Sequence, residues 1–241
     1  MTGTEAFSLA GRKILITGAS SGIGAACAAD FSDARLFLTG RNAERLAAFA
    51  GTRIVADLCD AAGREALVAG IDEPLDGIVF AAGTNARRPF AAISEKKLRS
   101  IFETNFFAAS LLCKSLLSAR KISAGASLVF IASIDGPVTV HPANGMYASS
   151  KAALSALART LALELSPSGI RVNLVCPGAV ETPLLHTDLS DEQLAADAAR
   201  YPLGRFGVPA DIAHAVRYLL SPAASWVTGT QFVIDGGITL I

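Results

Sequence analysis

Tyr147 and Lys151 are the two residues whose types and spacing most directly suggest chemistry. They are four positions apart in a stretch that predicts a helix, so their side chains lie on the same face, one turn apart. A phenol and an ammonium both titrate at about pH 10 when unperturbed, and a neighbouring cation lowers the pKa of the phenol. The pair can therefore exchange a proton with a substrate. The same spacing is also typical of ordinary exposed helix pairs, so the surrounding sequence must decide.

Ser133 stands at the end of the apolar run that precedes this helix. Its hydroxyl can donate a hydrogen bond to a carbonyl oxygen from that position. The stretch 133–151 thus ends one predicted strand, crosses a polar loop and opens the helix that carries Tyr147 and Lys151.

Short apolar runs alternate with helical segments along the whole chain. Such runs are typical of strands buried on both faces, and right-handed crossovers between them give an open parallel sheet with helices on both sides. The predicted strands are 13–17, 35–39, 53–57, 76–82, 127–133, 170–176 and 230–235. The first predicted helix runs from the glycine-rich turn to Phe31, and residues 41–50 are expected to form the start of a second. Further helices are predicted at 60–70, 94–120, 147–165, 190–199 and 209–220. We therefore expect a single α/β domain over residues 1–241, with a doubly wound parallel sheet of seven strands.

The segment Thr17–Gly24, TGASSGIG, joins the first predicted strand to the first helix. Glycines at such a turn let backbone amides approach a pyrophosphate at the helix N-terminus. The spacing G-x-x-x-G-x-G differs from the G-x-G-x-x-G of the usual dinucleotide fingerprint. Its place between a strand and a helix still predicts a nucleotide site.

Gly40 and Arg41 follow the second predicted strand, where an NAD site carries an acidic side chain for the ribose 2′-hydroxyl. Glycine adds no negative charge, and arginine can bind a 2′-phosphate through two hydrogen bonds. The two residues therefore favour NADP(H) as cofactor, with NAD(H) as the alternative. The other interpretation of Arg41 is a solvent-exposed residue at a helix start.

The composition excludes several classes of function. Hydrophobic residues make up 51% of the 241 residues and charged residues 17%, which is ample for a large core. The 21 basic and 21 acidic residues give a net charge of zero without a basic block, which argues against nucleic acid or a membrane as partner. The N-terminus carries no secretory pattern, and no apolar run approaches the ~20 residues of a membrane span. We expect a soluble, cytoplasmic protein.

The cysteines and histidines show no metal-binding pattern, and we expect no metal. No cysteine belongs to a C-x-x-C or has a histidine at ligand spacing, so buried, small, hydrophobic cysteines are expected. His214 lies on a predicted amphipathic helix and is expected to be structural, whereas His141 and His186 fall in loops and could line a pocket. The cysteines are Cys27, Cys59, Cys113 and Cys176.

In combination, the motifs resemble the short-chain dehydrogenase/reductase family along nearly the whole chain. Each motif is weak alone, but all of them in order at the family's spacing are specific. The resemblance implies a Rossmann-type fold, a nicotinamide cofactor, and hydride transfer between that cofactor and a carbonyl or alcohol carbon. The matching stretches are TGASSGIG (17–24), Asp57-Leu58, Ala81-Ala82-Gly83, Asn105, Ser133, YASSK (147–151), Pro177-Gly178 with Thr182, and Asp235-Gly236-Gly237.

The resemblance also implies a role for each matching residue. Tyr147 is similar to the family's general acid/base, Lys151 to the residue that lowers the pKa of that phenol and binds the nicotinamide ribose, and Ser133 to the residue that polarises the carbonyl. Asn105 matches the anchor of a water-linked proton relay. The residues that would bind the cofactor are Gly18, Ser20, Ser21, Gly22, Ile23, Gly24, Arg41, Asp57, Leu58, Ala82, Gly83, Tyr147, Lys151, Pro177, Gly178, Val180 and Thr182.

Within that set, Asp57 matches the family's adenine contact and Thr182 its carboxamide contact, which fixes the ring face that donates the hydride. One stretch departs from the family. Where Asn-Asn-Ala-Gly is common after the fourth strand, this chain has Phe80-Ala81-Ala82-Gly83. The backbone support at this point must therefore differ.

The substrate pocket is expected from residues 84–90, 134–146 and 181–207, the last as a lid beside the strand ends. Arg87 and Arg88 could meet an acidic substrate or a carrier phosphate, although solvation is the favoured interpretation. The resemblance is closest to the branch of 3-oxoacyl-carrier-protein reductases and related sugar or polyol dehydrogenases. The expected substrate is therefore a small carbonyl or alcohol compound, either a 3-oxoacyl thioester or a sugar or polyol.

A third hypothesis is a dinucleotide-sensing protein that kept the fold without turnover. The intact set of Ser133, Tyr147, Lys151 and Asn105 argues against it. The helices at 94–120 and 147–165 look apolar on more than one side, and the family commonly pairs such helices between subunits. We therefore expect a homotetramer or a homodimer.

Overall fold

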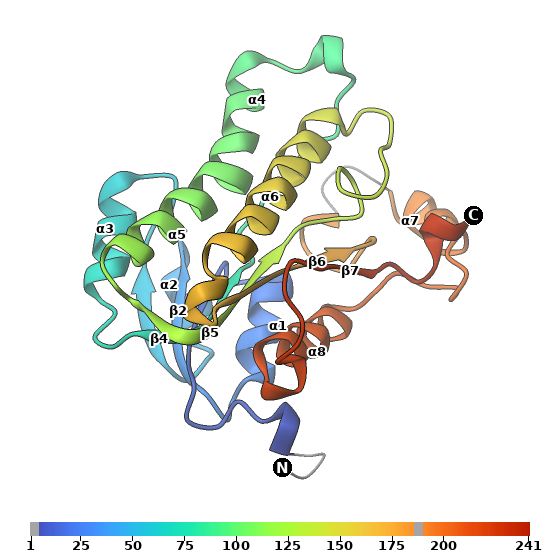
Figure 1. Ribbon diagram of the computed structural model, residues 1–241. Helices are drawn as coiled ribbons and strands as arrows, with labels where there is room; N and C mark the ends of the chain where they lie inside the picture. The colour runs from blue at the N-terminus through green and yellow to red at the C-terminus, as the bar shows by residue number, and fades with distance from the viewer. Residues whose placement is uncertain (1–4, 186–189) are drawn as a thin grey trace.

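The computed structural model describes residues 5–185 and 190–241, and it confirms the predicted α/β architecture. All seven strands are parallel, in the order β3-β2-β1-β4-β5-β6-β7 (Figure 1). The strand order reverses between β1 and β4, where ligands bind outside the carboxyl ends of open α/β sheets. The strands are β1 (Lys13–Thr17), β2 (Arg35–Gly40), β3 (Thr52–Val55), β4 (Leu75–Phe80), β5 (Ile122–Ile131), β6 (Arg171–Pro177) and β7 (Gln231–Ile234).

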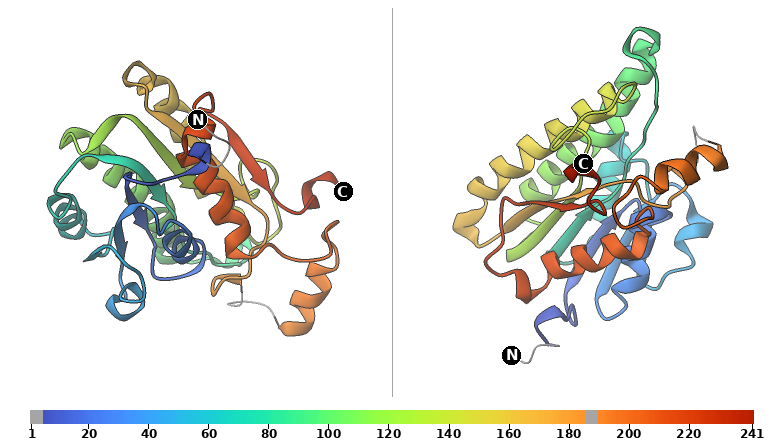
Figure 2. Two further views of the ribbon diagram at one scale, coloured as in Figure 1. Left: turned by 90° about the horizontal axis from the view of Figure 1, so that it is seen from below. Right: turned by 90° about the vertical axis from the view of Figure 1, so that its right-hand side faces the viewer.

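Helices cover both faces of the sheet, as the two further views in Figure 2 show. Side chains from α3, α5 and α6 pack on one face, and side chains from α1, α2 and α8 pack on the other. The helices are α1 (Gly22–Asp30), α2 (Ala43–Leu46), α3 (Ala61–Ala69), α4 (Glu95–Phe102), α5 (Ala108–Ser118), α6 (Gly145–Glu164), α7 (Asp191–Ala198) and α8 (Pro209–Leu220). No helix among these residues is both long and apolar enough to cross a membrane.

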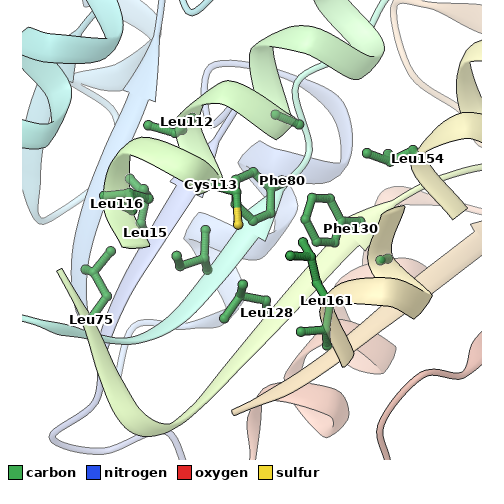
Figure 3. Close-up of a cluster of buried hydrophobic side chains, with 14 of the residues drawn as sticks. Leu15, Leu75, Phe80, Leu112, Cys113, Leu116, Leu128, Phe130, Leu154 and Leu161 are labelled. Atoms are coloured by element: carbon green, nitrogen blue, oxygen red, sulfur yellow. The ribbon is translucent and has the colours of Figure 1, made fainter. Parts of the chain in front are cut away.

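The aromatic pair Phe80 and Phe130 lies at the centre of one of these cores. The rings stack with centroids 4.3 Å apart and an interplanar angle of 8° (Figure 3). Such a pair contributes about 0.5–1.5 kcal/mol beyond the area it buries. Phe80, the first residue of the stretch that departs from the resemblance, is thus held by packing against β5.

The predicted helix 94–120 exists, but it is not one regular α-helix. Ser94 caps α4 by accepting from the Lys97 amide, and a π-helical stretch, Glu103–Phe107, then separates α4 from α5. Single π-turns inside helices often occur at functional sites. The buried residue of this stretch is Asn105, which the π-turn aims toward α6.

Two further expectations need correction. Cys27, Cys113 and Cys176 are buried, but Cys59 is exposed because it lies beyond the end of β3, where its sulfur contacts Thr104 Oγ1 at 3.6 Å. The helix expected to open at 41–50 covers only Ala43–Leu46, since the chain turns back at 47–51 to enter β3.

The segment predicted as a lid leaves the sheet after β6 and returns before α8. Its two ends are held together, because Glu181 N donates to Gly207 O at 2.8 Å and Gly207 N donates to Ala179 O at 3.0 Å. The predicted helix near 190–199 is α7. Part of the predicted lid, residues 186–189, lies outside the described residues, and so does His186.

Candidate active site

A cavity of about 370 Å³ lies outside the carboxyl ends of the central strands. The glycine-rich loop after β1 lines one part of it, and the segments after β5 and β6 line another. Every residue predicted for the site lines this cavity except Gly24 and Asn105. The structure therefore brings the predicted cofactor residues and the predicted proton-transfer residues to one space.

The glycine-rich loop is pressed against the chain that follows β4. Gly18 has a φ of +67°, and a Cβ atom there would lie 2.9 Å from the Ala82 backbone. A Cβ atom on Gly24 would lie 2.3 Å from Gly18 O, which explains why Gly24 supports the loop from behind. Ser21, the N-cap of α1, makes no side-chain capping bond, so no side chain there occupies the first amides of the helix. Such amides suit a pyrophosphate, and the loop fits a dinucleotide.

Thr17 provides the backbone support that the departure at Phe80-Ala81-Ala82-Gly83 calls for. Its hydroxyl accepts from Ala81 N at 3.0 Å and from Ala82 N at 3.2 Å. The buried hydroxyl thus holds the strand end in place where the family often uses asparagine.

Gly40 provides no acidic side chain of the kind that an NAD site carries, and a side chain at this position would displace that of Ser20. A Cβ atom at this position would lie 2.9 Å from Ser20 Oγ. Arg41 is exposed and lines the cavity beside it. Asp57 lies at the end of β3, with one carboxylate oxygen accepting from Cys59 N at 3.0 Å. This end of the cavity therefore offers a cation and a hydroxyl that could bind an anionic group.

Ser133, Tyr147 and Lys151 meet at the end of β5. The Ser133 hydroxyl bonds the Tyr147 phenol, and the Asp135 amide donates to Ser133 Oγ at 3.1 Å. Lys151 is buried, its Nζ donates to Ile131 O at 2.8 Å, and it lies 5.7 Å from the centroid of the Tyr147 ring. A backbone donor thus orients the serine hydroxyl. The bond to Ile131 O holds the Lys151 ammonium beside the Tyr147 ring.

The pKa values of this pair differ from the expectation that Lys151 lowers that of Tyr147. Burial raises the pKa of Tyr147 to about 12, although the bond with Ser133 opposes the rise. Burial also lowers the pKa of Lys151 to about 8. Burial outweighs any lowering by Lys151, because removal from water favours the neutral form of both groups.

Asn105 connects the π-turn to both sides of the site. Its Oδ1 accepts from Thr84 N at 2.8 Å, and its Nδ2 donates to Thr84 O at 2.9 Å and to Ser150 Oγ at 3.0 Å. The Ser150 hydroxyl in turn donates to Tyr147 O at 2.7 Å. Asn105 thereby fixes the loop after β4 relative to the turn of α6 that carries the phenol.

Replacing Asn105 with leucine is expected to lower the free energy of unfolding by about 2–4 kcal/mol, because it removes three hydrogen bonds and leaves backbone groups of Thr84 without them. Urea unfolding measures this loss. The control is Asn42→Leu, which removes only the cap of the exposed helix α2 and should cost about 1 kcal/mol. Equal losses in the two variants would show that Asn105 has no special structural role.

The expected pocket segments include Asp135 and Tyr201, but sequence reasoning assigned no role to either residue. Asp135 is buried, and its carboxylate bonds both His141 Nδ1 and Asn144 Nδ2. His141 lines the cavity, which agrees with the alternative that it lies in a pocket, and so does Arg87 although it is exposed. Tyr201 also lines it, and its hydroxyl accepts from Ala179 N at 2.9 Å. Asp135 stands only two positions after Ser133, which was the available signal.

The chain belongs to the short-chain dehydrogenase/reductase family. The family model described as Enoyl-(Acyl carrier protein) reductase matches residues 18–239. A tropinone reductase homolog of Arabidopsis thaliana is 34% identical over 97% of this chain and 94% of its own length. A solved structure named as a short chain dehydrogenase/reductase family protein is 33% identical, with a TM-score of 0.85 over 97% of this chain and all of its own.

A further solved structure bears on the cofactor. It comes from Beutenbergia cavernae and is described as a candidate NAD(P)-dependent gluconate 5-dehydrogenase with NADP bound at low occupancy. It is 33% identical to this chain, with a TM-score of 0.89 over 98% of this chain and 100% of its own. The cofactor and the substrate in that description are those of the relative.

Proposed function

We propose that the protein is an NADP(H)-dependent oxidoreductase that transfers a hydride between nicotinamide and a carbonyl or secondary alcohol carbon. The observation that carries this proposal is the single cavity lined by both the glycine-rich loop and the Ser133, Tyr147 and Lys151 side chains. The family membership supports the class of reaction. The NADP-bound relative supports the cofactor.

The cofactor would lie along the predicted residues. The amides of the glycine-rich loop would hold the pyrophosphate, Arg41 and Ser20 the 2′-phosphate, Asp57 and Leu58 the adenosine end, and Thr182 the carboxamide. The remaining predicted contacts would surround the nicotinamide, and they also line the cavity: Ala82, Gly83, Pro177, Gly178 and Val180. When bound, the nicotinamide supplies or accepts the hydride.

The protein's own residues supply the proton and transfer it to the substrate oxygen. During reduction, negative charge builds on the substrate oxygen, and the Ser133 hydroxyl and the Tyr147 phenol can both donate to it. The phenol proton completes the alcohol, and the Lys151 ammonium stabilises the phenolate that remains. A phenol whose pKa is about 12 is fully protonated at neutral pH, which suits the direction of reduction.

Arg41→Ala is expected to weaken NADPH binding by about 10- to 100-fold and to leave NADH binding unchanged, because only NADPH carries the 2′-phosphate. Titration of cofactor fluorescence with each variant measures both dissociation constants. Arg45→Ala, in the exposed helix α2 and outside the cavity lining, is the matched control. Equal weakening of both cofactors by Arg41→Ala would show that this residue does not bind the phosphate.

A substrate panel tests the proposed reaction. Ketones and 3-oxoacyl thioesters are offered with NADPH or NADH, and sugars and polyols with the oxidised cofactors, while nicotinamide absorbance is followed. Turnover with NADP(H) confirms the class, and the preferred compounds separate a 3-oxoacyl reductase from a sugar or polyol dehydrogenase. Binding of NADP(H) without any turnover would favour the dinucleotide-sensing alternative.

We also propose that the chain forms a homodimer or a homotetramer through its long helices. Phe107 and Leu111, at the junction of the π-turn with α5, are exposed, and so is Leu163 near the end of α6. Large apolar side chains exposed on neighbouring helices are typical of surfaces that pair between subunits.

A further inference from the structure

Asp135, His141 and Asn144 form a polar cluster at the edge of the cavity, which we call the Asp135 cluster. Asp135 is only 6% exposed, and each of its two carboxylate oxygens has a hydrogen-bond partner. One oxygen lies 2.5 Å from His141 Nδ1, and the other accepts from Asn144 Nδ2. A buried carboxylate is costly unless it is paired in this way, so the cluster is a built arrangement.

The loop that carries the cluster is held in a strained conformation. Ala143 has a φ of +61°, which is unfavourable for a residue with a Cβ atom. Its carbonyl accepts from Arg88 N at 2.8 Å. A Cβ atom on Gly136 would lie 2.1 Å from Ala148 O, so the loop is pressed directly onto α6. Backbone strain of this kind persists where the surroundings determine it, often at binding sites.

The Asp135 carboxylate determines which nitrogen of His141 is left to bind a ligand. A carboxylate accepts hydrogen bonds, so the Nδ1 position carries the proton and Nε2 is left for other partners. The His141 side chain is 53% exposed and lines the same cavity as Tyr147. In the neutral ring Nε2 accepts from a hydroxyl, and in the charged ring it donates to the hydroxyl oxygen.

We propose that His141 binds a substrate hydroxyl through Nε2 and thereby selects polyhydroxylated substrates, such as sugars, sugar acids or polyols, over substrates with a plain alkyl chain. This inference rests on the proposed oxidoreductase function and narrows its substrate class. Asp135 is the positioning residue, because it holds the ring and orients Nε2 toward the substrate.

Two polar side chains of the cavity wall, Tyr201 and Asn85, agree with this choice. The Tyr201 hydroxyl accepts from Ala179 N, so its own proton is left to donate. Asn85 lines the cavity as well. Its Oδ1 accepts from the adjacent Ala86 amide, so its side-chain NH₂ group is the part that is left to donate. An alkyl chain bound here would displace water from these polar groups and leave them without hydrogen bonds. A chain of hydroxyl groups would form new hydrogen bonds with them.

The test compares two acids of equal chain length. Gluconate carries hydroxyls along its chain, and 5-hydroxyhexanoate carries one. The kcat/KM of each is measured with NADP⁺ on the wild type, His141→Phe and His141→Gln, with His214→Phe as matched control. His214 is an exposed histidine near Asp30 and outside the cavity lining.

The wild type is expected to prefer gluconate by about 10- to 100-fold. His141→Phe should abolish this preference through the KM of gluconate and leave 5-hydroxyhexanoate unchanged, and His141→Gln should restore part of it. His214→Phe should match the wild type. No preference in the wild type, or an equal loss for both acids in His141→Phe, would overturn the inference.

Failure of the proposed reaction can be distinguished from failure of this inference. If the wild type oxidises neither acid, calorimetric titration of the NADP⁺-saturated protein with gluconate decides the point. Binding that is lost in His141→Phe and retained in His214→Phe supports the role of His141 without turnover. Absent binding, or binding that His141→Phe leaves unaltered, refutes it.

Discussion

Tyr147→Phe is expected to lower kcat by about 10³-fold and to leave the dissociation constant of NADPH unchanged. The substitution removes the proton donor that completes the alcohol, and general acid catalysis of this kind contributes about 10²–10⁴-fold. The ring itself remains, so the cavity beside Ser133 keeps its shape. Steady-state kinetics with the best substrate of the panel and fluorescence titration of NADPH measure the two quantities.

Tyr218→Phe is the control for this loss. Tyr218 packs against Phe7 and Phe232 and lies outside the cavity lining, so the loss of its hydroxyl should leave kcat within about twofold of the wild type. A Tyr147→Phe variant with full activity would remove the phenol from the reaction. A variant that also fails to bind NADPH would indicate a structural role for this side chain.

Lys151→Met is expected to lower kcat for reduction by about 10²-fold while the free energy of unfolding at pH 7 stays equal or rises. The folded-state pKa of about 8 lies below that of a free lysine, so the folded protein binds this proton less firmly than the unfolded chain. The buried charge therefore costs stability at pH 7, and methionine removes that cost together with the bond to Ile131. A less active but no less stable variant would separate function from folding.

The pH dependence follows with a definite sign. In the wild type, kcat for reduction should fall as the pH rises through about 8, because Lys151 loses the charge that stabilises the phenolate. This group's contribution to stability changes in the opposite sense, and the unfolding free energy should rise with pH between about 8 and 10. In Lys151→Met both trends should be absent. A pH profile of reduction that keeps the same falling limb in this variant would contradict the assignment.

The sheet could be predicted because its central strands are buried on both faces. Runs such as 35–39 and 170–176 are rich in apolar residues, and they coincide with β2 and β6 within one residue. The helix predicted at 209–220 agrees at both ends with α8, where Pro209 stands at the first turn and Val208 N bonds the Asp211 carboxylate. The candidate site was predictable to the extent that it follows strand ends and i,i+4 spacing.

The remaining features depend on the path of the chain in space. The π-turn that holds Asn105 arises inside a helical pattern that gives no local sign of it. The pairing of Asp135 with His141 requires the strained loop at Ala143, and no spacing rule encodes that loop. Burial is the main cause of the raised pKa of Tyr147, and the i,i+4 spacing to Lys151 could not predict that burial.

A crystal structure of the complex with NADP⁺ tests the central claim most directly. We expect the nicotinamide in the described cavity, with the Tyr147 hydroxyl directed at the space beside the hydride-bearing carbon and Lys151 Nζ within hydrogen-bonding distance of the adjoining ribose. A dinucleotide bound elsewhere, or a phenol turned away from the nicotinamide, would contradict the account.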